Sequence, residues 1–342
     1  MGSKNYFFKN LVFEGGGVKG ISYVGALEVL EKEGIYKGIE RVAGTSAGAI
    51  VAVLLGVGYS PNEIKKIMWN LDFQKFMDDS WGIIKDSQRL LNEFGWYKGD
   101  FFRSWIGDLI AQKLGNSEAT FDDLKHSLKE LNTKEIYLIG ANLSTGFSEI
   151  FSYEHTPRFC IADAARISMS IPLFFAGKRS IRGDLYVDGG LLENYPVKIF
   201  DRRKYVQSNW SRTDYYEKIN ESLKEQSRKI SDYVYNKQTL GFRLDSKEKI
   251  AMFRDQAEPP KRQIENFWDY TLALLGTLID AQDNSHLHSD DWQRTIYIDT
   301  LGVKATDFKI KEETKKALLQ SGIRYTEEYL KWYNNKEPKA NK

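Results

Sequence analysis

The chain has 342 residues, of which 42 % are hydrophobic and 28 % are charged, so it is long enough to bury a large core and has the composition of a globular protein. Its 49 Lys and Arg residues nearly balance 47 Asp and Glu residues, and because the two signs are interspersed, a dedicated nucleic-acid-binding protein is disfavoured. The one cysteine, Cys160, excludes an intramolecular disulfide framework and a cysteine-based zinc site, and its apolar neighbours predict a small buried residue.

The N-terminus and the apolar runs bear on membrane association. The N-terminus lacks the apolar segment of a signal peptide, and Tyr6 stands where a myristoylation signal needs Ser or Thr. The nearest approach to a membrane span, residues 270–279, is far too short. We therefore expect a cytoplasmic protein that meets lipid, if at all, peripherally at a membrane surface. Its oligomeric state is left open.

Two strand-to-helix units near the start of the chain predict the fold class. Residues 10–13 form a short apolar strand, and residues 21–32 place apolar side chains at helical spacing. The order repeats at 41–43 and 47–56. Consecutive units of this kind favour an α/β layer with a largely parallel sheet, in which ligands collect at the carboxyl ends of the strands. The glycine-rich turns at 15–20 and 44–48 lie at such ends.

Further elements follow along the chain. Ser60, Pro61 and Glu63 predict a capped helix that runs to about residue 70. Residues 72–105, dense in aromatics and interrupted by glycine, are typical either of helices packed on the core or of a mobile cap over an apolar cleft. Residues 201–235 have the composition of a solvated charged insertion. We expect other helices at 101–114, 121–131, 161–168, 311–320 and 325–332, and other strands at 136–141, 149–152, 185–187, 239–244 and 295–298.

The turn at residues 15–20 matches G-x-G-x-x-G, so a dinucleotide-binding loop has to be considered. That fold needs an acidic residue at the end of its second strand, whereas the second strand here ends in Gly44-Thr45-Ser46. A phosphate-binding loop fails as well, because Lys19 is followed by Gly20 instead of Ser or Thr. What remains is a row of backbone N–H groups beside a helix, which can cradle an oxyanion.

The stretch Gly44-Thr45-Ser46-Ala47-Gly48 has the G-x-S-x-G pattern between a short strand and a helix of small residues. A serine at a tight strand-to-helix turn needs flanking residues without bulk, and the turn lifts its hydroxyl into a cleft. The same turn aims the Ala47 N–H at the oxygen under attack. Ser46 is therefore a candidate nucleophile, although a glycine-rich turn with a serine helix cap fits the same five residues.

A serine nucleophile needs a base, and the sequence offers an aspartate or a histidine. The order Ser46, Asp188 and then His286 or His288 matches that of α/β-hydrolases, but that fold places its serine turn after several strands, and polar residues follow the two histidines. Asp188 stands at the end of an apolar strand, and Gly189 and Gly190 keep bulk away from it, so partial burial can make it the base. The four histidines of the chain are His126, His155, His286 and His288.

The three motifs, Gly-Gly-Gly-x-Lys-Gly at 15–20, Gly-x-Ser-x-Gly at 44–48 and Asp-Gly-Gly at 188–190, resemble those of the patatin-like phospholipase family. Residues 164–175 also resemble the segment that precedes the last motif in this family. The resemblance implies a three-layer α/β/α sandwich with a mainly parallel sheet and a nucleophile elbow. It implies a catalytic domain over residues 10–201. The resemblance says less about residues 202–342, which we expect to form a C-terminal extension packed on the same core.

The resemblance also implies residue roles. Ser46 is the nucleophile and Asp188 its base, with no metal and no cofactor. The oxyanion hole is formed by Gly15, Gly16 and Gly17, helped by the Ala47 N–H. Glu14 stands where many members carry Asp, a position that is not catalytic. The remaining motif positions are Lys19, Gly20, Gly44, Gly48, Gly189 and Gly190.

The expected function is that of a serine lipid acyl hydrolase acting on a phospholipid or lysophospholipid. Three alternatives stay open on the sequence: an acyltransferase that uses the same residues, a membrane-degrading effector activated by a ligand, and a non-catalytic lipid-binding module. The head group, the acyl position and the chain length of the substrate are not encoded in these motifs.

Overall fold

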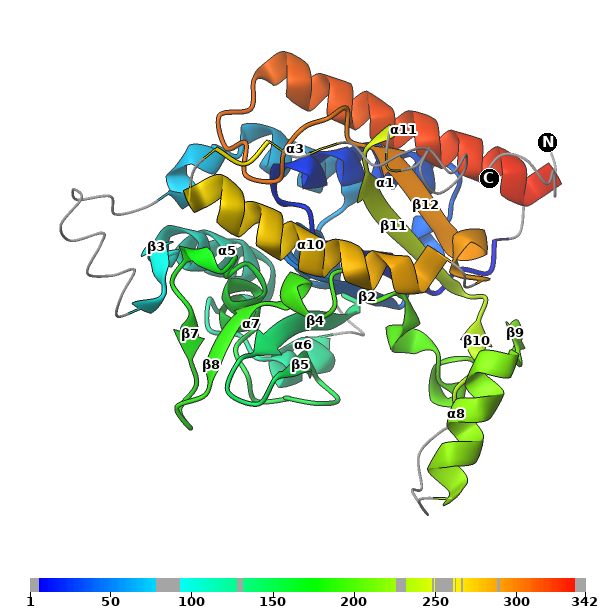
Figure 1. The fold of residues 1–342 in the computed structure, drawn as a ribbon. Coiled ribbons are helices and arrows are strands. Elements are labelled where there is room, and N and C mark those ends of the chain that lie inside the picture. The colour runs from blue at the N-terminus through cyan, green and yellow to red at the C-terminus, as the bar shows by residue number, and fades with distance from the viewer. Residues whose placement is uncertain are drawn as a thin grey trace.

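The computed structural model describes residues 6–77, 93–127, 132–225, 232–247, 249, 261, 263–265, 267–287 and 290–335. A mixed, mainly parallel sheet runs through the molecule in the order β12-β11-β1-β2-β4-β8-β7, with β5 also paired to β4 (Figure 1). The strands from β12 to β4 are parallel. β5 and β8 each pair antiparallel with β4, and β7 pairs antiparallel with β8. The sheet consists of β1 (Asn10–Phe13), β2 (Arg41–Gly44), β4 (Glu135–Asn142), β5 (Phe147–Ser152), β7 (Lys178–Arg179), β8 (Leu185–Asp188), β11 (Thr239–Asp245) and β12 (Thr295–Asp299).

The remaining elements surround this sheet. Two small pairs lie outside it, β3 (Gly95–Tyr97) with β6 (Leu173–Phe175) and β9 (Trp210–Ser211) with β10 (Tyr235–Asn236). The α-helices are α1 (Ser22–Lys32), α2 (Ala47–Gly56), α3 (Pro61–Asn70), α5 (Asp100–Leu114), α6 (Phe121–Ser127), α7 (Ile161–Ser168), α8 (Asp214–Glu225), α10 (Phe267–Leu287) and α11 (Glu312–Asn335). The 3-10 helices are η1 (Gly17–Ile21), η2 (Tyr36–Gly38), η3 (Phe73–Phe76), η4 (Gly189–Leu191), η5 (Val197–Phe200), η6 (Arg203–Tyr205) and η7 (Asp290–Arg294).

Alternation along the strands divides the buried residues between the two faces of the sheet. Leu11 and Phe13 of β1 belong to the large core that includes residues of α1, α2 and α11. Val12, between them, packs in a smaller cluster with Val197 and Phe200 of η5. Helical segments therefore lie on both faces, as expected of an α/β/α sandwich, and α10 crosses in front of the sheet in Figure 1.

The expected elements of the first 70 residues are confirmed nearly residue for residue. Strand β1 and helix α2 have the predicted bounds. The Ser60 capping box is present, because the Glu63 N–H donates to Ser60 Oγ at 3.3 Å and the Ser60 N–H donates to Glu63 at 2.8 Å. Ser60 therefore caps α3 as its sequence predicts.

The prediction of two separate closing helices is wrong, because α11 is continuous from Glu312 to Asn335. Gly322 lies within it and packs against α1 so closely that a Cβ there would be 1.9 Å from the carbonyl oxygen of Ser22. This glycine allows two helices to approach and does not end one of them.

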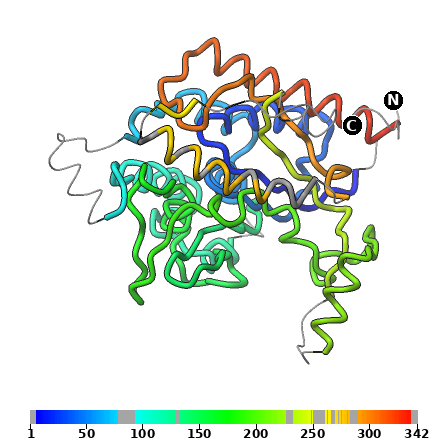
Figure 2. The backbone as a smooth tube through the Cα atoms, in the orientation of Figure 1, coloured from blue at the N-terminus to red at the C-terminus, as the bar shows by residue number. Residues whose placement is uncertain are grey.

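The aromatic stretch from residue 72 to residue 105 packs largely on the core. Phe73, Phe76 and Phe102 are buried, and the Phe76 ring lies edge-on to that of Phe102 at 5.4 Å. Residues 78–92, where a mobile cap was an alternative, lie outside the described residues. The expected charged insertion holds α8, which projects away from the body in Figures 1 and 2.

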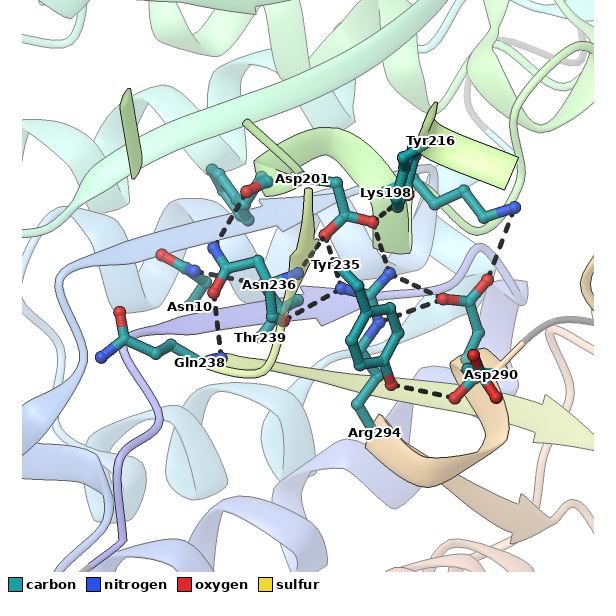
Figure 3. Close-up of polar contacts among 12 residues, drawn as sticks. Asn10, Lys198, Asp201, Tyr216, Tyr235, Asn236, Gln238, Thr239, Asp290 and Arg294 are labelled. Carbon is teal, nitrogen blue, oxygen red and sulfur yellow. Dashed lines mark hydrogen bonds and ion pairs between the residues drawn. The ribbon is translucent and has the colours of Figure 1, made fainter. Parts of the chain in front are cut away.

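A buried polar network joins the last third of the chain to Asp201 at the amino ends of the strands (Figure 3). Arg294 donates two hydrogen bonds to the Asp201 carboxylate, both at 2.6 Å, and two to Asp291 Oδ1, at 2.6 and 3.1 Å. The Arg294 guanidinium also donates to the Asn236 carbonyl at 3.1 Å. This edge of the sheet is opposite the carboxyl ends, where both glycine turns lie.

In the part of the chain that the structure describes, no helix has both the length and the apolar character that crossing a bilayer requires.

Candidate active site

Ser46 lies in the turn between β2, which ends at Gly44, and α2, which begins at Ala47. Its backbone has φ 53° and ψ −124°, a conformation that is strained for a residue with a side chain. The Ser46 N–H donates to Ser168 Oγ at 3.0 Å, which helps to hold this strained turn. The local geometry is that of a nucleophile elbow.

Asp188 ends β8 and is buried, with 5 % of its surface exposed. Its Oδ1 atom accepts the Gly190 N–H at 2.7 Å, and its own N–H donates to the Ser170 carbonyl at 2.8 Å. Its Oδ2 atom is buried without a hydrogen bond to any residue that the structure describes. One carboxylate oxygen is thus engaged by the backbone, and the other is buried without such a bond.

The side chains of Ser46 and Asp188 influence each other. Burial raises the pKa of the Asp188 carboxyl to about 7, and the Gly190 hydrogen bond and the nearby Ser46 hydroxyl limit this rise. The Ser46 hydroxyl itself donates to Met169 Sδ at 3.8 Å. The hydroxyl therefore points at the sulfur in this geometry, within the electrostatic reach of the carboxyl but without a well-aligned bond to Oδ2.

In the first glycine turn, residues 15–20, some backbone N–H groups donate to other residues, and others have no acceptor among the described residues. The Gly15 N–H donates to the Asn194 carbonyl at 3.1 Å, which takes this amide out of the expected set of oxyanion donors. The N–H groups of Gly16, Gly17 and Ala47 have no hydrogen-bond acceptor among the described residues. Gly17 has φ +58°, a backbone conformation that favours glycine.

Asn194 and Glu14 support this turn, and sequence reasoning missed the role of both. Asn194 Nδ2 donates to Glu14 Oε1 at 3.2 Å, and Glu14 Oε2 accepts the Leu244 N–H at 2.6 Å. The Asn194 N–H donates to Gln282 Oε1 of α10 at 3.1 Å. Asn194 follows the Asp-Gly-Gly motif by four residues in an ordinary polar loop, so its sequence carries no signal of this role.

A cavity of about 710 Å³ contains the candidate residues. Its lining includes Ser46, Asp188, Gly16 and Gly17. Helix α10, which the sequence reasoning did not predict, forms part of its wall. The apolar or small residues of the lining include Ile171, Pro172, Leu191, Leu244, Ala273, Gly276, Ile279 and Val303. The cavity thus combines a polar centre with walls suited to hydrocarbon.

The histidine alternative receives no support from the described residues. His155 Nδ1 lies 2.8 Å from Ser152 Oγ, and His126 is exposed on α6. Neither lines the cavity. The backbone of His286 belongs to α10, and His288 lies outside the described residues.

One group of acidic and sulfur side chains lies outside the cavity, on α7 and the segments that pack against it. Among the described residues, Glu118, Cys160 and Asp163 place ligand atoms within 4.8 Å of one another. The Arg103 guanidinium donates to both carboxylates, at 2.5 Å to Glu118 and 3.2 Å to Asp163. The positive charge of Arg103 therefore already lies between them. Cys160 is half-buried and lies 3.4 Å from an Arg103 nitrogen, so the prediction of a buried apolar cysteine is wrong.

Comparisons with known proteins define the family. The model described as patatin-like phospholipase matches residues 11–201. A Bacillus subtilis protein named YqhO is 33 % identical over 94 % of this chain and 97 % of its own length. The chain therefore belongs to the patatin-like phospholipase family.

Other relatives and structures agree with this assignment. The cGAMP-activated phospholipase of Escherichia coli is 26 % identical over 55 % of this chain and 53 % of that protein. The probable lipid hydrolase 463L of Invertebrate iridescent virus 6 is 28 % identical over 60 % of this chain and 69 % of that protein. VipD from Legionella pneumophila has the same fold, with a TM-score of 0.63 and 18 % identity over 96 % of this chain and 67 % of VipD.

Proposed function

We propose that the protein is a serine lipid acyl hydrolase that cleaves the acyl ester bonds of phospholipids or lysophospholipids. The observation that supports this most is that Ser46, on a strained turn, and Asp188, a buried carboxyl with a raised pKa, line one cavity together. Membership of the patatin-like phospholipase family supports the same substrate class.

In the proposed acylation step, the Ser46 hydroxyl rotates from Met169 toward Asp188 Oδ2 and gives up its proton there. Its Oγ atom bonds to the ester carbonyl carbon, and the carbonyl electron pair moves to oxygen. The N–H groups of Gly16, Gly17 and Ala47 donate to this oxyanion, with the start of α2 adding its positive dipole end. Collapse of the intermediate expels the lipid alkoxide, which takes the proton from Asp188.

In the proposed deacylation step, water replaces the departing lipid alcohol. Asp188 removes a proton from this water as its oxygen attacks the acyl carbon, and then returns the proton to Ser46 Oγ as the fatty acid leaves. The same amides stabilise the second oxyanion. Backbone dipoles and one carboxyl group thus supply the whole cycle, so the scheme uses no metal ion.

We also propose that α10 contacts the lipid surface. Ala273, Gly276 and Ile279 of this helix line the cavity. On another side of the helix, Tyr270, Leu274 and Leu278 are 56 %, 52 % and 46 % exposed and lie one helical turn apart. An exposed apolar stripe beside a catalytic cavity is suited to peripheral contact with a membrane.

The experiment is release of fatty acid from phospholipid micelles in the presence of EDTA. We expect Ser46→Ala and Asp188→Asn to lower release on the order of 10⁴-fold, because nucleophile and base act as one unit. Ser148→Ala is the matched control, since Ser148 is exposed on β5. Release by Ser46→Ala equal to that of the parent protein would remove the proposal, and acyl products formed with an added alcohol would identify a transferase instead.

A further inference from the structure

Four lysines line the catalytic cavity, and they come from separate parts of the chain. Lys19 belongs to η1 and Lys304 to the loop after β12, while Lys249 and Lys261 follow β11. Lysines placed by four different segments around one cavity produce a positive field inside it.

Three of these lysines belong to segments at the edge of the sheet where the candidate oxyanion amides lie. Lys19 Nζ donates to the Leu244 carbonyl at 3.4 Å, at the end of β11. Lys249 Nζ lies 3.7 Å from Asp245 Oδ1, one residue further along. Lys304 is held at the same edge by its neighbour Ala305, whose carbonyl accepts the Val18 N–H at 3.0 Å.

The carboxyl groups of the lining offset this positive charge only in part. Glu14 is buried and lies 3.9 Å from Arg243 Nε, and Asp245, the partner of Lys249, lies 3.2 Å from the same nitrogen, so the Arg243 charge meets part of the negative charge of both carboxylates. Asp188 has a pKa of about 7, so it is neutral for part of the time at that pH. Asp269, on α10, is the remaining carboxyl among the described residues that line the cavity.

We propose that this lysine cluster, Lys19, Lys249, Lys261 and Lys304, selects phospholipids whose head group carries a net negative charge. The inference rests on the proposed function and names the substrate class of the same cavity. In a glycerophospholipid a few bonds separate the acyl ester from the phosphate, so an ester at Gly16 and Gly17 leaves the phosphate in the cavity that the four lysines line. Lysine ammonium groups attract that phosphate and repel the quaternary ammonium of a choline head group.

Binding of short-chain lipid monomers tests this inference without turnover. Ser46→Ala protein is titrated with dihexanoyl phosphatidylglycerol and with dihexanoyl phosphatidylcholine, below their micelle concentrations, by calorimetry. We expect the anionic lipid to bind about tenfold more tightly at low salt, with the difference shrinking as salt is added. Equal affinity for the two lipids would overturn the proposal.

Charge variants then locate the effect. Lys261→Gln with Lys304→Gln is expected to remove most of the preference, and Lys261→Arg with Lys304→Arg to restore it, because arginine keeps the charge. The matched control is Lys37→Gln with Lys237→Gln, which removes the same charge from exposed residues that precede β2 and β11, at the opposite edge of the sheet. A preference that falls as much in this control as in the cavity variant would also overturn the proposal.

The two proposals fail in different ways. If the parent protein releases no fatty acid from any lipid but Ser46→Ala still prefers the anionic lipid, the hydrolase proposal fails and the head-group inference holds for a binding cavity. If the parent protein hydrolyses both lipids equally and Ser46→Ala binds them equally, the hydrolase proposal holds and the head-group inference fails.

Discussion

Asp188 accepts the Gly190 N–H through Oδ1 at 2.7 Å, while Oδ2 is buried without a hydrogen bond to any residue that the structure describes, as the proposed base requires. The backbone bond fixes the carboxyl plane at the end of β8. Because burial disfavours the charged form, the same carboxyl has a proton affinity far above that of a surface aspartate. Position and basicity therefore come from one local arrangement, a strand end followed by two glycines.

The pH dependence of hydrolysis should report this pKa. Asp188 acts as a base only when deprotonated, and its pKa is about 7, so kcat/KM for a soluble ester is expected to rise tenfold per pH unit below 7 and to level off above it. The measurement covers pH 5 to 9, with circular dichroism recorded at each pH as the control for folding. A rate that stays flat down to pH 5 would show that the carboxyl ionises near its ordinary pKa.

Alanine at Gly17 is expected to cost more activity than alanine at Gly34. Both glycines have positive φ, +58° and +75°, so each substitution adds roughly 1 kcal/mol of backbone strain. A Cβ at Gly17 would also lie 2.0 Å from the Ala305 carbonyl oxygen, whereas one at Gly34 meets nothing within 4 Å. Gly17→Ala must therefore displace its own amide.

Ester hydrolysis and thermal unfolding of both variants measure the difference. Loss of one oxyanion donor lowers kcat on the order of 10²-fold, and this is expected of Gly17→Ala alone. Gly34→Ala should lose stability but retain turnover. Equal turnover in the two folded variants would argue against an oxyanion role for the Gly17 amide.

Much of the site was predictable because its chemistry depends on local sequence. A serine between small residues at a strand end, and an aspartate followed by two glycines, each specify a turn with few alternatives. The meeting of Ser46 and Asp188 does not follow from parallel strand ends, because β8 runs antiparallel to β4. The register sets Asp188 opposite Gly140, two residues beyond Leu138, which pairs with Gly44 at the end of β2, so the meeting depends on pairing between distant strands. The engagement of the Gly15 amide by Asn194 depends on a contact between distant parts of the chain, which no local pattern encodes.

Helix α10 was not predicted because its residues carry conflicting signals. Its outer side bears Tyr270, Leu274 and Leu278, so the helix has apolar residues both toward the cavity and toward solvent. A surface helix is predicted from one apolar stripe opposite one polar stripe, and the sequence of α10 does not divide in this way. This composition is reasonable for a helix with a cavity on one side and lipid on the other.

Removing the outer apolar residues of α10 tests its contact with membranes. Leu274→Ser with Leu278→Ser is expected to lower hydrolysis of vesicle phospholipid at least about fivefold relative to hydrolysis of a monomeric ester, because each buried leucine contributes on the order of 1.5–3 kcal/mol. The matched control is Ile181→Ser, which removes a fully exposed apolar residue from the turn between β7 and β8. If Ile181→Ser lowers the same ratio equally, α10 has no special role at the lipid surface.

The Arg294 guanidinium lies between the buried carboxylates of Asp201 and Asp291 (Figure 3). Arg294→Met leaves Asp201 and Asp291 without their main partner, and such a change typically costs about 3–5 kcal/mol in the free energy of unfolding. Arg324→Met is the control: Arg324 pairs with Glu328 at 2.8 Å on the exposed surface of α11, where solvent screens the pair, so its loss is expected to change the free energy of unfolding little. Urea unfolding at pH 7 gives both values. Because Asp201 and Arg294 join segments 93 residues apart, a loss for Arg294→Met no greater than for Arg324→Met would mean that this network does not hold the last third of the chain to the sheet.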